Sequence, residues 1–493
     1  MRGKVVHIGL DGLNPDLVLE WRAELPNLDS LMKEGIWGRI ESTVPPITPQ
    51  AWTCMMSGKN PGHFGFWNFT YRSDYTYAEP NLVNSKVVME RVETLYTILP
   101  RFGKKVAIIN LPVSYPPPKI ENGFSISCFM IPTLGKQFTN PPELKEEIIE
   151  IIGEYIIDAS TSDTNYRVMD KDLVLKRIYD MDKQRFDLTE YFISQKRCDY
   201  VFTVIMGTDR MPHLFYKYFD ENHVRYEKSD KYKNALKNHY KFCDSKIGRI
   251  RDMLDSNTVM IINSDHSVQR LDGRINLNEW LLKEGYLRLN KYPEKLTLLR
   301  NCVVDWRNTR AWATGYTGQI YLNVRGREEY SIVEPKDYHN LLDELSEKMI
   351  DITDPKGRKL DTKVFKRTDI HSGPFSRFGP DLFINFDDCR WNISELIGHG
   401  KGELYSYDTL LGADDGGHGQ YGFFVIAGAG VPKLGETEAH LLDIAPTVLT
   451  LMGQSVPEDM EGRILVKFES EKVYSEEDED KVKKRLAALG YLG

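Results

Sequence analysis

The stretch Lys4–Gly12, KVVHIGLDG, decides the fold of this 493-residue chain. It is an almost continuous apolar run that stops at an Asp-Gly pair, which is typical of a strand buried on both faces of a parallel sheet. Asp11 closes the run. An isolated Asp-Gly pair is more often an ordinary turn, so Asp11 gains meaning only from the residues that accompany it elsewhere in the chain.

Five further short apolar runs repeat this pattern, each followed by a polar or Gly-rich loop: Lys104–Leu111, Asp199–Met206, Asn257–Ile262, Asp381–Asn385 and Gly422–Ala427. Helical patterns lie between them, at Leu28–Lys33, Val88–Leu99, Pro142–Ile152, Tyr232–Leu254 and Leu441–Leu451. Strands that alternate with helices predict an α/β fold with a doubly wound, mostly parallel central sheet and helices on both faces. Ligands of such sheets bind beyond the carboxyl ends of the strands.

Two stretches interrupt the alternation, and they predict how the chain is divided. We expect a catalytic core in three parts, an inserted helical segment, an inserted cap and a C-terminal helical tail. The core parts are 1–129, 196–271 and 379–470, the mainly helical insertion is 130–195, the cap is 272–378 and the tail is 471–493. Because the cap lies between two candidate ligand loops, it is well placed to cover the site.

The composition is that of an ordinary globular protein, with 41% hydrophobic and 28% charged residues. A net charge of -8 argues against a nucleic-acid polymer or a membrane surface as partner, because both need a basic footprint. No apolar run reaches the ~18 residues of a membrane span, and the N-terminus does not read as a signal peptide, so we expect a cytoplasmic protein. The six cysteines form no Cys-x-x-Cys pair and are expected to be reduced thiols.

Thr48 begins a short segment that predicts a helix, with Pro49 at its first turn and Gly58 just past its end. Thr48 could be a helix cap and nothing more. The free amides and positive dipole end of such a helix also stabilise a phosphate or a threonine alkoxide. Since a hydroxyl is a weak nucleophile until a base or metal removes its proton, we expect a metal beside Thr48.

Polar residues of the metal-binding types follow the predicted strands. Asp209 and His213 are four residues apart and would share one face of a helix. Asp265 and His266 are adjacent on a loop, and His418 lies in a Gly- and Asp-rich loop that could simply be a flexible turn. Each signal is weak alone.

Taken together these residues predict two metal sites. The first would comprise Asp209, His213 and His418, and the second Asp11, Asp265, His266 and the Thr48 oxygen. A mixed set of histidine and carboxylate ligands favours zinc over calcium or magnesium, with manganese and iron also open. We therefore expect two divalent metal ions.

The order of these residues resembles the alkaline phosphatase superfamily, most closely its type I phosphodiesterase and nucleotide pyrophosphatase branch. The likeness covers nearly the whole chain. Flanking phrases also look like a subgroup of predicted phosphohydrolases or phosphomutases: Asn60-Pro61-Gly62, Gly207–Arg210, Asn276–Leu281 and Asp443–Thr447.

The resemblance implies that Thr48 is the nucleophile and forms a covalent phosphothreonine intermediate. The metal held by Asp11, Asp265 and His266 would activate Thr48. The metal held by Asp209, His213 and His418 would bind the leaving group and then activate water, as in other paired-metal phosphoryl transfer sites.

The resemblance also implies two substrate-binding residues. Asn68 lies about where the branch places an asparagine that binds a phosphate oxygen, although Phe66-Trp67-Asn68-Phe69 departs from the usual surroundings. Arg210, next to Asp209, is a candidate phosphate clamp or a surface residue. The expected substrate is a small-molecule phosphate ester or nucleotide.

Other protein classes use some of the same residue types. A sulfatase needs a modified Cys or Ser where this chain has Thr48, and a dehydrogenase or P-loop protein needs glycine-rich motifs that are missing. A phosphomonoesterase or phosphomutase could use the same metals, and a catalytically inactive metal-stabilised binding protein is the alternative outside the enzymes. The leaving group and the oligomeric state are left open by the sequence.

Overall fold

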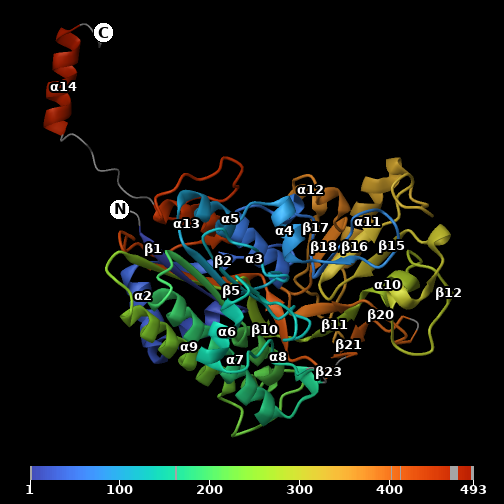
Figure 1. Ribbon diagram of the computed structural model, residues 1–493. Helices are drawn as coiled ribbons and strands as arrows, with labels where there is room; N and C mark the ends of the chain where they lie inside the picture. The colour runs from blue at the N-terminus through green and yellow to red at the C-terminus, as the bar shows by residue number, and fades with distance from the viewer. Residues whose placement is uncertain (1–2, 162–163, 401, 411, 467–475, 490–493) are drawn as a thin grey trace.

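The computed structural model describes residues 3–161, 164–400, 402–410, 412–466 and 476–489 (Figure 1). A ten-stranded central sheet has the order β26-β2-β25-β9-β1-β8-β5-β6-β7, with β27 also paired to β2. Its strands are β1 (Lys4–Leu10), β2 (Ile36–Glu41), β5 (Val106–Leu111), β6 (Gly123–Ser127), β7 (Thr139–Asn140), β8 (Tyr200–Ile205), β9 (Thr258–Asn263), β25 (Tyr421–Gly428), β26 (Gly435–Glu436) and β27 (Ala439–His440).

The centre of this sheet is parallel. β1 pairs in parallel with β8 on one side and β9 on the other, and β5 continues the parallel order beyond β8. β25 lies between β2 and β9 and is antiparallel to both. The predicted α/β class with a mostly parallel sheet is confirmed.

Helices cover both faces of the sheet (Figure 1). The alternation of side chains in β1 explains why: Val5 joins the hydrophobic cluster on one face, while Val6 and Ile8 join the cluster on the other. The first face is covered by α3 (Thr48–Ser57), α5 (Leu95–Ile98) and α13 (Ile444–Leu451), and the second by α1 (Pro15–Glu20), α2 (Pro26–Glu34), α7 (Lys171–Ser194), α8 (Gly207–Phe219) and α9 (Ala235–Asp252).

The expected helical insertion, 130–195, is part of this layer. α7 packs against β8, and α6 (Leu144–Ile152) packs against α7 over a cluster that includes Ile109 and Ile126 of the sheet. β7 extends the sheet itself by pairing with β6. The segment is therefore continuous with the core, although how the chain divides into domains stays a prediction.

A separate hydrophobic core lies in the region expected to be the cap. It surrounds an antiparallel four-stranded sheet in the order β15-β16-β18-β17. The strands are β15 (Ala311–Thr314), β16 (Gly318–Leu322), β17 (Lys363–Lys366) and β18 (Leu382–Asn385), and α10 (Leu277–Lys283) and α11 (Tyr338–Ile350) pack around them.

The prediction that β18 belongs to the central sheet is wrong. β18 pairs with β16 and β17, because an apolar run reports that a strand is buried and not which sheet buries it. β11 (Gly273–Asn276) likewise pairs with β19 (Trp391–Ser394) and β21 (Tyr405–Ser406). These strand pairs cross the expected boundary at residue 378, and the division into domains stays a prediction.

In the C-terminal tail the structure describes α14 (Glu476–Ala488), while 471–475 and 490–493 lie outside the described residues. Within the described part of the chain no helix combines the length and apolarity that a bilayer crossing requires. All six cysteines are free thiols.

Candidate active site

Three neighbouring strands of the central sheet are each followed by a carboxylate, and the three carboxylates lie at the same edge of the sheet. Asp265 follows β9, Asp11 follows β1, and Asp209 lies in the first turn of α8, which begins directly after β8. These strands are adjacent and parallel in the order β9-β1-β8, so their carboxyl ends meet at the same edge. All three carboxylates are buried.

Thr48 reaches the same edge from α3. The structure places Ile47 at the N-cap and Thr48 as the first helical residue, one position later than a capping role requires, and Gly58 ends the helix with a positive φ of 66°. The Thr48 hydroxyl lies 3.2 Å from Nε2 of His266. Thr48 is thus brought beside a predicted metal ligand.

His418 arrives on a short strand. Its loop forms β24 (Gly416–Gly419), which pairs antiparallel with β10 (Ser267–Arg270), directly after His266. The glycines make this possible, because a Cβ on Gly416 would lie 2.6 Å from the Val268 side chain. The His266 and His418 rings stack with centroids 3.8 Å apart.

The three histidines present the same ring nitrogen to the site. Nδ1 of His213 is 2.6 Å from the Asp414 carboxylate, and Nδ1 of His418 donates to the Pro46 carbonyl at 2.9 Å. Nδ1 of His266 meets the carbonyl of the following residue at 3.1 Å. With every Nδ1 engaged, Nε2 is the nitrogen of each ring that could bind a cation, the arrangement usual for metal-binding histidines.

The carboxylates show a matching pattern. Asp11 Oδ1, Asp209 Oδ1 and Asp265 Oδ2 are buried and have no hydrogen-bond partner among the described residues. Their other oxygens are occupied: Asp11 Oδ2 accepts from the Trp52 indole at 2.9 Å and Asp265 Oδ1 from the Gly12 amide at 3.2 Å. They face the Nε2 atoms of His213, His266 and His418 at 3.2 to 3.8 Å. Because a buried carboxylate oxygen without a hydrogen bond is costly, these three oxygens fit a cation-binding role.

The ligand-type atoms form two overlapping groups in which all atoms lie within 4.8 Å of one another: Asp209, His213 and His418, and Asp11, Asp209 and His266. Asp265 adjoins the second group, with Oδ2 3.2 Å from His266 Nε2. The structure therefore brings all seven predicted residues together. It also places Asp209 between the two groups, which the sequence did not indicate.

The electrostatics are those of a site short of positive charge. Burial and then the neighbouring Asp209 raise the pKa of Asp11 well above its usual range, and burial and Asp11 do the same to Asp265. Burial opposes protonation of His213, but Asp414 and Asp209 outweigh it and raise its pKa to about 9. A bound cation would relieve this repulsion between buried carboxylates.

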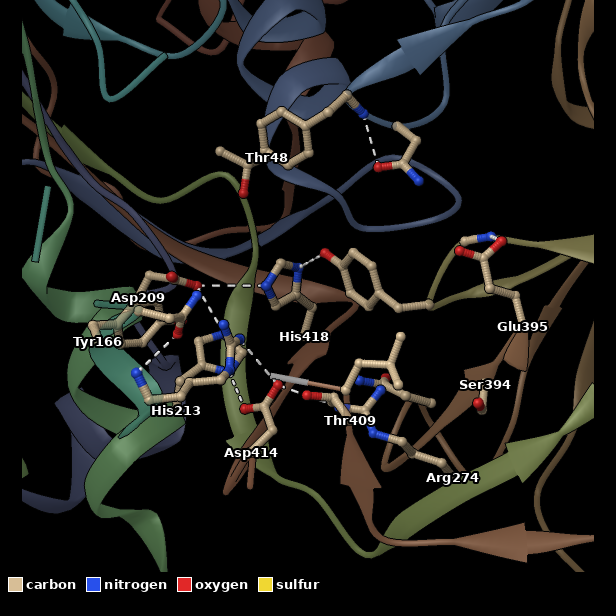
Figure 2. A pocket seen from close by; sticks show the side chains of 18 of the residues that line it. Thr48, Tyr166, Asp209, His213, Arg274, Ser394, Glu395, Thr409, Asp414 and His418 are labelled. Atoms are coloured by element: carbon tan, nitrogen blue, oxygen red, sulfur yellow. Dashed lines mark hydrogen bonds and ion pairs between the residues drawn. The ribbon is translucent and has the colours of Figure 1, made fainter. Parts of the chain in front are cut away.

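The two predicted substrate-binding residues line the same cavity, which has a volume of about 680 Å³. Thr48 also lines this cavity, as Figure 2 shows. Arg210 is no surface residue: Nη1 lies 2.5 Å from Asp209 Oδ2 and Nε 3.1 Å from Asp158. Asn68 Oδ1 accepts from the Phe69 amide at 2.8 Å.

Sequence reasoning missed four residues of this cavity: Arg167, Arg274, Tyr316 and Asp414. Asp414 accepts hydrogen bonds from Arg167 at 3.1 Å and Arg274 at 3.2 Å. The place of Asp414 in the same Gly-rich loop as His418 was a usable signal. The two arginines come from distant segments, and nothing in the sequence around them signals a role in the site.

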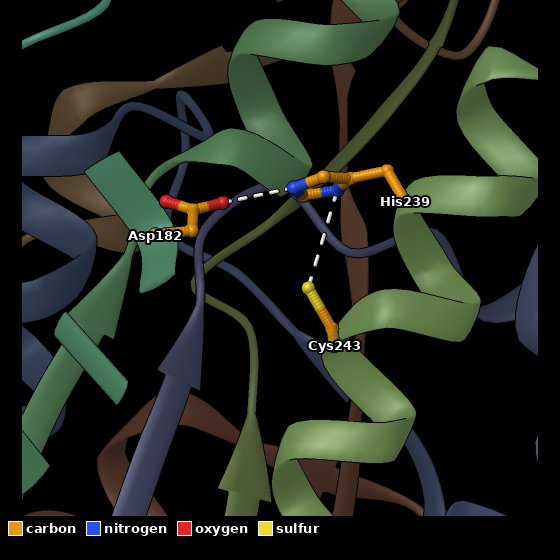
Figure 3. A group of neighbouring side chains, drawn as sticks. All are labelled: Asp182, His239 and Cys243. Atoms are coloured by element: carbon orange, nitrogen blue, oxygen red, sulfur yellow. Dashed lines mark hydrogen bonds and ion pairs between the residues drawn. The ribbon is translucent and has the colours of Figure 1, made fainter. Parts of the chain in front are cut away.

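A third group of metal-binding residue types comprises Asp182 of α7 and His239 and Cys243 of α9, all buried (Figure 3). Asp182 meets His239 Nε2 at 2.9 Å, whereas Cys243 Sγ lies 4.0 Å from the opposite nitrogen, Nδ1. The three groups thus do not converge on one point. Asp182 also accepts from the Gly207 amide at 3.2 Å, so the group supports the first turn of α8.

The doubly wound sheet, with ligand-type side chains gathered at its carboxyl edge, defines an alkaline phosphatase-like α/β protein. A model of the type I phosphodiesterase / nucleotide pyrophosphatase family matches residues 5–409. The chain belongs to this family, as the resemblance predicted.

Among solved structures, the chain is similar to murine ectonucleotide pyrophosphatase / phosphodiesterase 5, in an inactive threonine-to-alanine variant with AMP, at 14% identity over 92% of this chain and 96% of that one, with a TM-score of 0.50. The human counterpart gives 15% identity over 94% and 97%, also with a TM-score of 0.50. At this identity the likeness shows the fold. No curated protein matches the chain.

Proposed function

We propose that the protein is a metal-dependent phosphohydrolase that cleaves a phosphodiester or nucleotide pyrophosphate through a covalent phosphothreonine intermediate. The observation that carries the proposal is the set of three buried carboxylate oxygens that accept no hydrogen bond from a described residue and face histidine Nε2 atoms beside the Thr48 hydroxyl. The family membership supports the reaction class.

Two divalent cations, zinc by the ligand set, would be held by Asp209, His213 and His418 and by Asp11, Asp265, His266 and the Thr48 oxygen, with Asp209 close to both. When bound, such a pair lowers the pKa of the nucleophile and of water and stabilises charge on the attacking and leaving oxygens. Asp414, Pro46 and the backbone after His266 hold the imidazole rings in the orientation that this requires.

In the first step Thr48 gives its hydroxyl proton to solvent, the Thr48 oxygen forms a bond to phosphorus, and the bond from phosphorus to the leaving-group oxygen breaks. In the second step a water oxygen bonds to phosphorus and gives up a proton, the bond to the Thr48 oxygen breaks, and the Thr48 oxygen takes a proton back, which restores the enzyme. The free amides at the start of α3 would stabilise charge on the phosphoryl group.

The guanidinium of Arg210 favours a diester over a monoester. It is engaged by both Asp158 and Asp209, so it has little capacity left to clamp a doubly charged monoester phosphate. The similar murine protein was solved with AMP, which supports a nucleotide as one half of the substrate. The same proposal includes a small-molecule substrate, Asn68 as a phosphate ligand and a cytoplasmic location.

The test is Thr48→Ala in zinc-loaded protein. We expect loss of phosphodiester turnover with unchanged metal content, because the carboxylates and histidines remain. Thr53→Ala is the matched control, since the Thr53 hydroxyl bonds the Pro49 carbonyl within the same helix and does not line the cavity. Turnover by Thr48→Ala comparable to that of the control would refute the nucleophile.

A further inference from the structure

One wall of the cavity contains a pair of arginines. Arg167 and Arg274 both donate to Asp414, each through Nη2 alone. The same carboxylate is also shared with His213. Two guanidinium groups therefore share one carboxylate, and neither has a carboxylate partner of its own among the described residues.

The other arginines of the region differ in this respect. Arg210 has two carboxylate partners, Asp158 and Asp209. Arg225 likewise pairs with two, Asp408 and Asp415. Of these four arginines, only Arg167 and Arg274 share a single carboxylate.

Arg274 is almost fully buried, and two of its guanidinium nitrogens have no partner in the described part of the protein. Its residue is 4% exposed, Nε is buried without a partner, and Nη1 makes no hydrogen bond to any described residue. Burial, together with the repulsion of Arg167 and Arg225, lowers its pKa against the opposing pull of Asp414. An unsatisfied buried guanidinium is expensive, and a second anion would stabilise it.

Asn392 stands beside Arg274 with an unused amide. The two residues are register partners in the parallel pair of β11 and β19, so their side chains share a face, and both line the cavity. Asn392 is 5% exposed, and its side chain has no hydrogen-bond partner among the described residues. A buried amide without a partner, next to an unsatisfied guanidinium, indicates a ligand with several acceptor oxygens.

The acidic groups of this wall do not fill that role. Asp408 pairs with Arg225. Glu395 accepts from the Gly315 amide at 3.3 Å, and burial raises its pKa. Neither has a hydrogen bond or ion pair to Arg274.

We propose that Arg274, Asn392 and Arg167 form a subsite for an oxyanion carried by the leaving group of the substrate, a phosphate or a carboxylate. The subsite rests on the proposed function. It adjoins the group formed by Asp209, His213 and His418, because Asp414 links His213 to both arginines. A leaving group released there extends directly toward this wall.

The experiment compares three nucleoside 5′-phosphate esters that share the nucleoside and differ in the leaving group. The 4-nitrophenyl ester carries no charge there, the 4-carboxyphenyl ester carries a carboxylate, and the 5′-triphosphate releases pyrophosphate. We measure kcat/KM for zinc-loaded wild type, Asn392→Ala, Arg274→Gln and the control Arg249→Gln, which removes an arginine that is 63% exposed and outside the cavity.

The ratio of kcat/KM for an anionic ester to kcat/KM for the nitrophenyl ester should fall roughly ten- to a hundredfold in Asn392→Ala and Arg274→Gln. Arg249→Gln should keep the wild-type ratio. The ester that shows the fall identifies the anion as phosphate or carboxylate.

A merely structural role gives a different result. Arg274→Gln would then loosen Asp414 and slow all three esters equally, and Asn392→Ala, which does not touch Asp414, would leave the ratio unchanged. Either unchanged ratio overturns the subsite while the proposed function stands. Wild type that cleaves none of the esters contradicts the proposed function itself.

Discussion

Asp414 determines how His213 is presented to the site. It accepts from His213 Nδ1 and is itself held by Arg167 and Arg274, all at hydrogen-bond distance. His213, Arg167 and Arg274 keep the pKa of Asp414 below its usual range in spite of burial. The carboxylate is therefore charged and fixed at neutral pH.

Asp414→Ala should weaken zinc binding by about 10- to 100-fold, because His213 loses the group that orients its ring. Asp414→Asn keeps an oxygen acceptor for His213 and should therefore lose less zinc affinity than Asp414→Ala. Competition with a chromogenic chelator measures both affinities. Asp230→Ala, which removes a carboxylate that is 86% exposed, is the control, and equal affinities in all four proteins would contradict the role of Asp414.

His7 is a buried histidine that the mechanism does not use. Nε2 lies 2.5 Å from Asn263 Oδ1 and Nδ1 3.1 Å from the Tyr200 hydroxyl, and burial lowers its pKa from 6.5 to about 4. Below pH 6.5 the unfolded chain gains a proton at His7 that the folded chain takes up only near pH 4. Folding stability is therefore lost as the pH falls through this window.

His7→Gln should remove that loss. Between pH 7 and pH 5 the wild-type free energy of unfolding should fall by about 2 kcal/mol more than that of the variant. Urea denaturation at the two pH values measures the difference. The same fall in both proteins would mean that His7 does not titrate in this window.

The residues missed by sequence reasoning were those whose roles depend on distant partners. Asp11, Asp209 and His266 could be predicted because each follows an apolar run that reads as a buried strand. Asp414 shares a Gly-rich loop with His418, which was a usable signal, but the sequence does not show that Asp414 contacts His213. Nothing along the chain indicates that Arg274 meets Asp414.

At the scale of elements, the first turn of α8 depends on the group formed by Asp182 and His239. Asp182 accepts from the Gly207 amide, and all three residues are buried. A Cβ on Gly207 would lie 1.9 Å from Asp182 Oδ2. Asp209 sits in the same turn, so this packing sets where its carboxylate lies.

Gly207→Ala should destabilise the protein by about 1–3 kcal/mol, because the methyl group overpacks a filled core, and should weaken zinc binding by displacing the turn. Gly135→Ala is the matched control, since its Cβ would meet only the Thr133 hydroxyl, at 3.6 Å. Urea denaturation and zinc titration measure the two effects. If Gly207→Ala binds zinc as tightly as the control, the packing of α8 does not determine the geometry of the metal site.

Two elements differ from their prediction for physical reasons. The loop around His418 is a strand, because its glycines let β24 approach β10 closely enough to pair. β18 was expected in the central sheet and lies in the cap. In both cases the partner strand, which lies far away in the sequence, decides the outcome.

At the scale of the whole molecule, the site gathers buried carboxylates whose mutual repulsion costs stability. A cation that binds the folded chain and not the unfolded chain stabilises the fold by mass action. Chelation should therefore abolish activity and lower the melting temperature, and zinc or manganese should restore both.

Calorimetry and turnover on the same samples check this prediction. Asp209→Asn, which alters the carboxylate shared by both groups, should show little increase in melting temperature with zinc. Full activity in the presence of chelator would contradict metal dependence.

The cap shows why its function cannot be tested by deleting 272–378. That deletion would remove β16 and β11 and leave β18 and β19 without their pairing partners. Substitutions of Arg274 and Asn392 alter the wall of the cavity and leave these ladders in place.

The antiparallel position of β25 between β2 and β9 bears on how the protein is made. During synthesis the growing chain completes β1, β8 and β9 long before β24 and β25 leave the ribosome. Until then β2 and β9 lack the strand that joins them, and His418 has not been made. Loading of a cation would consequently be a late event in biogenesis, and a chain truncated before residue 416 would emerge with an open sheet edge and no competence for catalysis.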